Sequence, residues 1–170
     1  MLSALFRRTP LPASPWPVTV YYDGTCTLCN TEMTNLMLRN TRGLLRFVDC
    51  SQPGFNAGPP GVDPRELMRV LHAQTANGTL VLGIPAFELA YAGAGLNLIA
   101  GLLGAPVLHP IAVWLYPFVA DNRERFPKWL ARVMFGTAVR RAAERAAVQQ
   151  CGDGRCHVAP APVDSTSQPF

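Results

Sequence analysis

The most informative stretch of the chain is Tyr21-Tyr22-Asp23-Gly24-Thr25-Cys26-Thr27-Leu28-Cys29. The β-branched and aromatic run that leads into it, Val18 to Tyr22, predicts a buried strand. Asp-Gly then predicts a tight turn, and apolar side chains recur at helical spacing from Cys26 onward. The stretch therefore predicts a strand, a turn and a helix whose first turn carries two cysteines.

The placement of these two cysteines favours thiol chemistry, as in thioredoxin-like redox sites. Unpaired backbone N–H groups and the positive end of the helix dipole stabilise a thiolate at Cys26 and bring its pKa to about 7 or below. Cys29 lies one turn further on, on the same face of the helix. We therefore expect Cys26 to be the nucleophile, at the exposed end of the helix. Cys29, on the buried face, is expected to be the resolving thiol.

A Cys-x-x-Cys pair also suits half of a tetrahedral zinc site. The other clustered candidates are Cys151, Cys156 and His157, far along the chain. The strand-turn-helix setting favours redox use over zinc, and no metal, nucleotide or organic cofactor is implied. Cys50, at the end of an expected strand, is interpreted as a buried inert thiol.

Asp23 precedes Cys26 by three residues and has two interpretations. Its carboxylate can accept N–H groups of the turn and set the geometry of the cysteine loop. If partly buried, it can instead take the proton of Cys29 as that thiol attacks. The sequence does not separate the two, and Asp23 is kept beside Cys26 and Cys29 as a candidate catalytic residue.

The signature Asp23, Cys26, Cys29 resembles that of the DCC family of predicted thiol-disulfide oxidoreductases. The likeness extends from about Val18 to Phe126 and includes a late element with Tyr116, Ala120 and Asn122-Arg123. The resemblance implies a thioredoxin-like fold and a redox activity. It also implies that Arg123 holds a carboxylate such as Asp23.

The fold class we expect is α/β, with a thioredoxin-like β-α-β-α-β-β-α core at 18–92 and a helical C-terminal extension at 93–147. A flexible leader at 1–17 and a disordered tail at 148–170 complete the predicted organisation. Asn77-Gly78 predicts the hairpin between the last two strands. One departure concerns the cis-proline that thioredoxin-like proteins usually place before the third strand: Glu66 to Arg69 contain no proline. Docking of a substrate backbone there is therefore not predicted.

An uncharged run joins the end of the core to the extension: Leu89 to Ala120 contains no Asp, Glu, Lys or Arg. Glycines and prolines divide it, which predicts two short helices rather than one membrane span. Two apolar stripes are expected to pack on the sheet or on each other. They are Leu96, Ile99 and Leu103, and then Ile111, Trp114, Leu115 and Phe118. A peripheral membrane contact is the alternative.

The composition of the chain limits its number of domains, its compartment and its class of protein. The chain has 170 residues, 49% of them hydrophobic, a net charge of +4 and five cysteines. These values favour one domain with extensions and a reducing compartment over a disulfide-stapled secreted protein. We therefore expect a cytoplasmic location, with association at a membrane as the alternative. No motif predicts nucleic-acid binding, and the oligomeric state is not indicated.

The function predicted from the sequence is thiol-disulfide exchange through a mixed disulfide on Cys26. The substrate would be a protein or low-molecular-weight thiol or disulfide, and cycling would need a partner such as glutathione, a thioredoxin system or a membrane redox protein. The rival prediction is a non-catalytic thioredoxin-like binding module. It would dock to a membrane or a protein partner, with its cysteine pair structural or zinc-bound.

Overall fold

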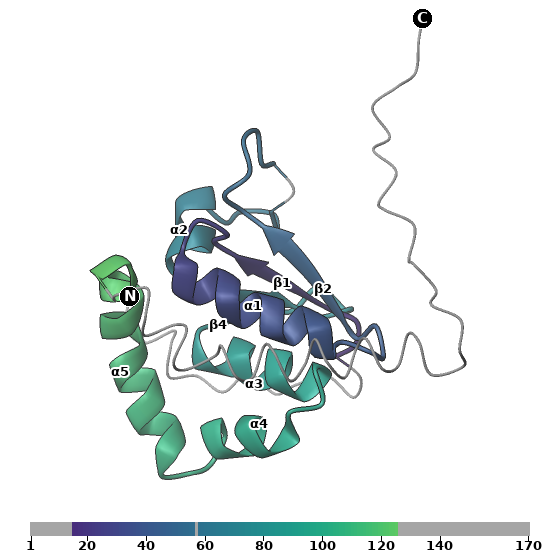
Figure 1. Cartoon of the computed structure of the whole chain (residues 1–170), viewed down its shortest axis with the longest axis vertical. Coiled ribbons are helices and arrows are strands. Elements are labelled where there is room, and N and C mark those ends of the chain that lie inside the picture. The colour runs from purple at the N-terminus through teal and green to yellow at the C-terminus, as the bar shows by residue number, and fades with distance from the viewer. Residues whose placement is uncertain (1–14, 57, 126–170) are drawn as a thin grey trace, which may run out of the picture.

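The computed structural model describes residues 15–56 and 58–125, which form a mixed α/β unit (Figure 1). The predicted element order is confirmed. The third strand, which the sequence predicts over Val70 to Thr75, covers only His72–Gln74. The expectations for residues 1–14, 126–147 and the tail 148–170 concern residues outside this description. The elements in chain order are β1 (Val18–Tyr22), α1 (Thr27–Arg39), β2 (Leu45–Asp49), α2 (Pro64–Arg69), β3 (His72–Gln74), β4 (Leu80–Leu82), α3 (Ile84–Gly93), α4 (Asn97–Leu103), α5 (Leu108–Asn122) and the short 3₁₀ helix η2 (Arg123–Arg125).

The four strands form one sheet in the order β2-β1-β3-β4. β1 and β2 are parallel, because α1 returns the chain to the same end of the sheet. β3 runs antiparallel to both β1 and β4. The predicted hairpin turn is confirmed: Gly78 has a φ of 85°, which residues other than glycine rarely adopt. β1 lies between β2 and β3 and is therefore an interior strand. Its last residue leads directly into the cysteine turn.

Alternation along β1 divides the core between the two faces of the sheet. Val18, Val20 and Tyr22 belong to the main cluster, which also contains Met33 and Leu36 of α1 and residues of α3. Tyr21 points to the other face, where a smaller cluster contains Leu67 of α2 and Cys50. Both faces of the sheet are thus covered by helix, and α1 is fixed by its buried side chains.

Three polar contacts among the described residues attach α5 to this core. The backbone N–H of Leu71, just before β3, donates to the hydroxyl of Tyr116 of α5 at 2.8 Å. Nδ1 of His109 and Oε1 of Glu88 lie 2.7 Å apart and join α5 to α3. Arg69 of α2 reaches Asp121 of α5 at 3.1 Å.

The two predicted short helices, α4 and α5, are present, but the inward face of α5 differs from the prediction. Ile111, Trp114, Leu115 and Phe118 are exposed, whereas Val113 and Ala120 are buried. The apolar pattern was ambiguous because nearly every position of α5 is apolar, so that hydropathy marks no unique face. The hydrogen bond of Tyr116 selects the face that turns inward.

Among the described residues, no single helix has the length and apolar composition needed to cross a membrane. α4 and α5 meet that test only when taken together, and they are bent by 86° at the break between them.

Tyr116→Phe tests the attachment of α5. The substitution keeps the ring but leaves the N–H of Leu71 without its acceptor, so we expect the free energy of unfolding to fall by about 1–3 kcal/mol. Urea unfolding measures this change. Phe118→Leu, at an exposed position of the same helix, is the control and should change stability by about 0.5 kcal/mol or less. Equal stabilities of Tyr116→Phe and the wild type would show that this hydrogen bond does not hold α5.

Candidate active site

Cys26 is the N-cap residue of α1, and its sulfur accepts a hydrogen bond from the backbone N–H of Cys29 at 3.3 Å. The thiol of Cys29 also donates to this sulfur, and that bond does most to lower the pKa of Cys26, to about 6. Burial opposes the shift, while backbone N–H groups and the positive charge of Arg123 support it. The local geometry therefore favours a thiolate on Cys26 at neutral pH.

The two cysteine residues are not equally exposed, and the expected exposure of Cys26 is wrong. Cys26 is only 5% exposed, because its sulfur turns back to the N–H groups of the first turn. Cys29 is partly exposed. Its pKa is raised because its proton is held by the Cys26 sulfur and because it is largely buried. Neither cysteine forms a disulfide, so the arrangement is that of the reduced pair.

Asp23 is buried and holds the cysteine turn together. Its Oδ1 accepts from the backbone N–H of Thr25 at 2.9 Å and from the hydroxyl of Thr25 at 2.6 Å. Its Oδ2 accepts from Nη2 of Arg123 at 2.7 Å. The pairing that the resemblance implied for Arg123 is thus present. Because Asp23 is engaged at both oxygens, this geometry favours its role in the turn.

A second aspartate, Asp49 at the end of β2, supports the same turn from the neighbouring strand. Its Oδ1 accepts from the N–H of Gly24 at 2.9 Å and also from the N–H of Ser51. A side chain at position 24 would collide with this carboxylate, which explains the glycine. Sequence analysis assigned no role to Asp49, although its place at the carboxyl end of the strand beside β1 was a usable signal.

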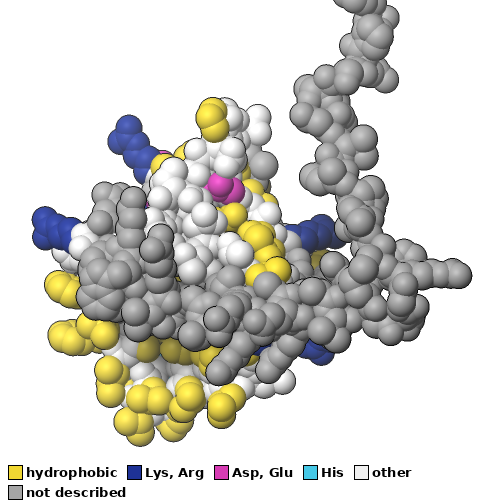
Figure 2. All heavy atoms as spheres, in the orientation of Figure 1, with side chains coloured by type: hydrophobic (Ala, Val, Ile, Leu, Met, Phe, Trp, Pro, Cys, Tyr) yellow, Lys and Arg dark blue, Asp and Glu magenta, His cyan; other side chains and the backbone are white. Residues whose placement is uncertain are grey.

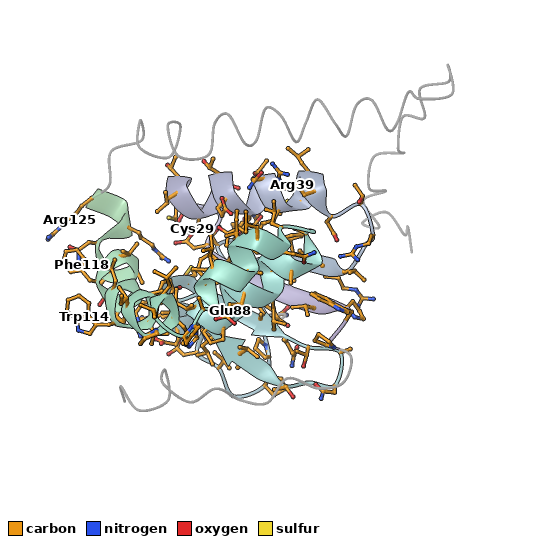
Figure 3. All side chains as sticks on the ribbon, turned by 90° about the horizontal axis from the view of Figure 1, so that it is seen from below. Cys29, Arg39, Glu88, Trp114, Phe118 and Arg125 are labelled. Atoms are coloured by element: carbon orange, nitrogen blue, oxygen red, sulfur yellow. The ribbon has the colours of Figure 1, made fainter. Side chains whose placement is uncertain are left out.

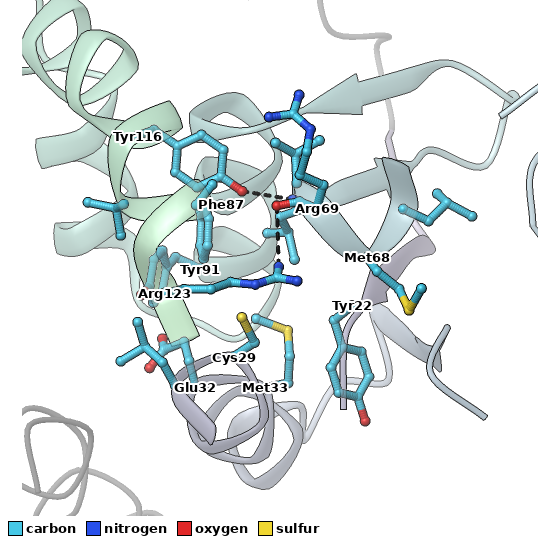
Figure 4. Close-up of a pocket in the computed structure, with 16 residues that line it drawn as sticks. Tyr22, Cys29, Glu32, Met33, Met68, Arg69, Phe87, Tyr91, Tyr116 and Arg123 are labelled. Carbon is cyan, nitrogen blue, oxygen red and sulfur yellow. Dashed lines mark hydrogen bonds between the residues drawn. The ribbon is translucent and has the colours of Figure 1, made fainter. Parts of the chain in front are cut away.

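An apolar cavity of about 120 Å³ lies beside the cysteine pair (Figure 4). Cys29 lines it, and Cys26 does not. The Val70-Leu71 segment before β3 lines it too, where the sequence lacks the expected cis-proline, and the N–H of Leu71 is already bound by Tyr116. The remaining lining residues are Tyr22, Leu28, Glu32, Met33, Leu67, Met68, Arg69, Phe87, Tyr91, Tyr116, Val119, Ala120 and Arg123.

Glu32 is the feature of this cavity that sequence reasoning missed. It follows Cys29 by three residues on α1, and it is buried despite being a carboxylate. The missed signal was its spacing, since i and i+3 positions share a helix face.

The remaining cysteines and histidines of the described part contribute little to the pair. Burial raises the pKa of Cys50 to about 11, which agrees with an inert thiol. His72 is buried, and its Nδ1 lies 2.8 Å from the carbonyl oxygen of Val70. Residues 15–56 and 58–125 contain no group of three His, Cys, Asp or Glu side chains placed to hold a metal. Cys151, Cys156 and His157 lie outside the described residues.

Arg123→Gln tests the electrostatics of the pair. The substitution removes a positive charge beside the thiolate and releases the carboxylate of Asp23, and both changes raise the pKa of Cys26 above about 6. The ultraviolet absorbance of the thiolate, followed against pH, measures this value. Arg65→Gln, which removes an exposed arginine of α2 outside the cavity, should leave the pKa unchanged. An equal pKa in Arg123→Gln and the wild type would exclude an electrostatic role for Arg123.

Comparison with known proteins places the chain in a family. An uncharacterized chloroplastic protein of Arabidopsis thaliana is 36% identical over 93 residues, which cover 54% of this chain and 43% of that protein. The chain thus matches less than half the length of this relative. No solved structure matches the chain. The model of the DCC1-like thiol-disulfide oxidoreductase family matches residues 20–144, which include the cysteine turn, the cavity and Arg123. The chain therefore belongs to the DCC1-like thiol-disulfide oxidoreductase family.

Proposed function

We propose that the protein is a thiol-disulfide oxidoreductase with a thioredoxin-like fold, in which Cys26 is the nucleophile and Cys29 the resolving thiol. The observation that carries the proposal is the N-cap position of Cys26, whose sulfur accepts from the N–H and the thiol of Cys29. The β-α-β-α-β-β-α order, with the pair at the start of the first helix, supports the fold. The family supports the type of reaction.

The reaction proceeds in two exchange steps. The Cys26 thiolate attacks one sulfur of a substrate disulfide, forms a mixed disulfide and releases the other substrate sulfur as a thiolate. Cys29 then loses its proton and attacks the sulfur of Cys26, which closes the Cys26–Cys29 disulfide and releases the second substrate thiolate. Two electrons pass from the cysteine pair to the substrate disulfide. The reverse sequence oxidises a substrate dithiol.

The buried position of Cys26 limits which substrate disulfides can reach its sulfur. The sulfur of a cysteine that is only 5% exposed is reached by a small disulfide, or by an extended protein segment, more readily than by a disulfide within a flat surface. We infer a protein or low-molecular-weight disulfide as substrate and a cellular thiol such as glutathione or a thioredoxin system as the regenerating partner. The predicted cytoplasmic location provides such thiols, and the Arabidopsis relative is described as chloroplastic.

A redox titration tests the proposal. In glutathione buffers, followed by alkylation and mass spectrometry, we expect one two-electron transition between about −270 and −120 mV that is assigned to Cys26 and Cys29. Cys26→Ser should abolish exchange. Cys29→Ser should accumulate the mixed disulfide on Cys26, because the resolving step is lost. Cys50→Ser is the control and should leave the transition in place. A pair that never closes, or that is alkylated only after chelation, would contradict the proposal.

A second, docking role is favoured by one observation, the exposed apolar surface of α4 and α5. Figure 2 shows hydrophobic side chains gathered over these helices, and Figure 3 shows Trp114 and Phe118 pointing away from the body. Leu98 is 79% exposed and Trp114 is 75% exposed. The other exposed apolar residues of this surface are Ile99, Leu102, Val107, Leu108, Ile111, Leu115 and Phe118. Such a contiguous apolar surface marks an interaction site.

We propose an anionic lipid surface as the occupant. The surface carries no charged side chain, as the uncharged run from Leu89 to Ala120 requires, whereas protein interfaces usually have a polar rim. Arg65 of α2 lines a hollow with Ala120 and Asp121 at the C-terminal end of α5, Arg125 follows that end in η2, and the whole chain carries a net charge of +4. Both features suit the negative potential of an anionic leaflet.

Leu98→Glu and Trp114→Glu test the lipid contact. Burial of a large apolar side chain contributes about 1.5–3 kcal/mol, so each substitution should weaken co-sedimentation with phosphatidylserine-containing vesicles about tenfold or more. Met37→Glu, at an exposed apolar position of α1, is the matched control and should bind like the wild type. A wild type that ignores the vesicles, or one that dimerises through this surface in light scattering, would contradict the lipid assignment.

A further inference from the structure

Glu32 lies in an environment that is unfavourable for a carboxylate. Its side chain is 4% exposed, and neither Oε1 nor Oε2 has a hydrogen-bond partner among the described residues. Tyr91 and Asn35 face it closely enough to favour its charged form, but neither reaches hydrogen-bond geometry. An ionised carboxylate without partners costs stability when it is buried. A leucine at this position would avoid that cost, which raises the question of what the carboxylate does.

The position of Glu32 on α1 and in the cavity lining indicates a role for its carboxylate. Glu32 and Cys29 are one turn apart on α1 and line the same cavity (Figure 4). The cavity of about 120 Å³ is large enough to admit water, and the two side chains share this one space on the same face of α1. Glu32 is the only carboxylate among the residues that line the described cavity. Asp23 is absent from that lining, and its oxygens are held by Thr25 and Arg123.

The resolving step needs a proton acceptor at this place. Once Cys26 is part of a mixed disulfide, Cys29 still carries its proton, and burial disfavours its thiolate. The other titratable or charged groups that face the cavity are phenols and guanidinium groups, which are poor bases at neutral pH. They are Tyr22 from β1, Arg69 from α2, Tyr91 from α3, Tyr116 from α5 and Arg123 from η2. Arg39, also on α1, acts on Glu32 through its charge.

We propose that Glu32 is the proton acceptor of the resolving thiol: its carboxylate takes the proton of Cys29 as Cys29 attacks the mixed disulfide on Cys26. The S–S bond between Cys29 and Cys26 forms, the bond from Cys26 to the substrate sulfur breaks, and the substrate leaves as a thiolate that takes a proton from solvent. The disulfide of the protein is closed and Glu32 is left protonated. In the opposite direction, protonated Glu32 returns the proton to Cys29 as the disulfide opens.

The environment of Glu32 suits this role. Burial raises its pKa above the ordinary value for a glutamate, which makes the carboxylate a stronger base for a thiol. Because only the ionised form accepts a proton, the resolving rate falls as the pH drops through this raised pKa.

The inference rests on the proposed function, and a single-turnover experiment separates the two. The full chain, with Cys50, Cys151 and Cys156 replaced, is reduced and mixed with a substoichiometric amount of the aromatic disulfide dithiobis(nitrobenzoate). The first coloured thiolate reports the attack of Cys26. The second reports the resolving step of Cys29. Stopped-flow absorbance resolves the two phases at each pH.

Glu32→Gln should leave the first phase unchanged and slow the second about 100-fold, as expected for the loss of a positioned base. It should also abolish the acid inflection of the second phase. Glu32→Asp keeps a titrating group and should retain an inflection, which covers the case in which the glutamine variant folds poorly. Glu88→Gln, which removes a carboxylate paired with His109 outside the cavity, is the matched control and should match the wild type in both phases.

Urea unfolding at neutral pH separates a chemical from a structural role. A group whose pKa is raised in the folded state loses stabilising free energy as the pH rises through that pKa. Glu32→Gln should therefore be at least as stable as the wild type at neutral pH. A slow second phase in a variant of undiminished stability supports the proposal.

Three results would overturn the inference. If both phases of Glu32→Gln match the wild type, Glu32 is not the acceptor, and the proposed function stands. If Asp23→Asn rather than Glu32→Gln removes the acid inflection, the acceptor is Asp23. If the wild type shows no first phase, the proposed function fails, and the role of Glu32 fails with it.

Discussion

The ion pair between Asp23 and Arg123 joins two segments that are 100 residues apart in the chain. One partner belongs to the turn that presents Cys26, and the other to the short helix that follows α5. Both side chains are largely buried, where an unpaired charge is costly, so the turn and the end of the extension have to be in place together. Arg123 also donates to the carbonyl of Arg69 at 3.2 Å, which links the pair to the end of α2. This one contact therefore couples the geometry of the cysteine turn to the closure of the cavity.

This contact also reconciles two opposing charges at the site. A carboxylate three residues before a thiol raises the pKa of that thiol, and Asp23 is needed for the turn. Arg123 neutralises it and adds a positive field that lowers the pKa of Cys26. The thiol of Cys29 contributes most to this lowering of the pKa, and the N–H of Cys29 adds to it. The turn thus keeps its acidic residue without losing the acidic thiol.

Much of this arrangement was predictable from local sequence. The strand into Tyr22, the Asp-Gly turn and the helix that starts after Cys26 follow from patterns that act over a few residues, and the Asn77-Gly78 hairpin does too. The pairing of Asp23 with Arg123 was implied by the family resemblance, not by spacing. The buried position of Cys26 was missed because the side-chain direction of a cap residue depends on the N–H groups it faces. The inward face of α5 was missed because a uniformly apolar helix has no hydropathic face, and a single tyrosine hydroxyl sets its rotation.

The C-terminal extension is more than an addition to the αβ core. Tyr116 occupies the N–H of Leu71 at the position where thioredoxin-like proteins usually have a cis-proline and this sequence has none, so the backbone there is bound to the protein itself. Tyr116, Val119, Ala120 and Arg123 close one side of the cavity that Cys29 opens into. The same helix turns its other face, with Trp114 and Phe118, to the outside. Any partner that binds this exposed face therefore contacts the element that closes the cavity.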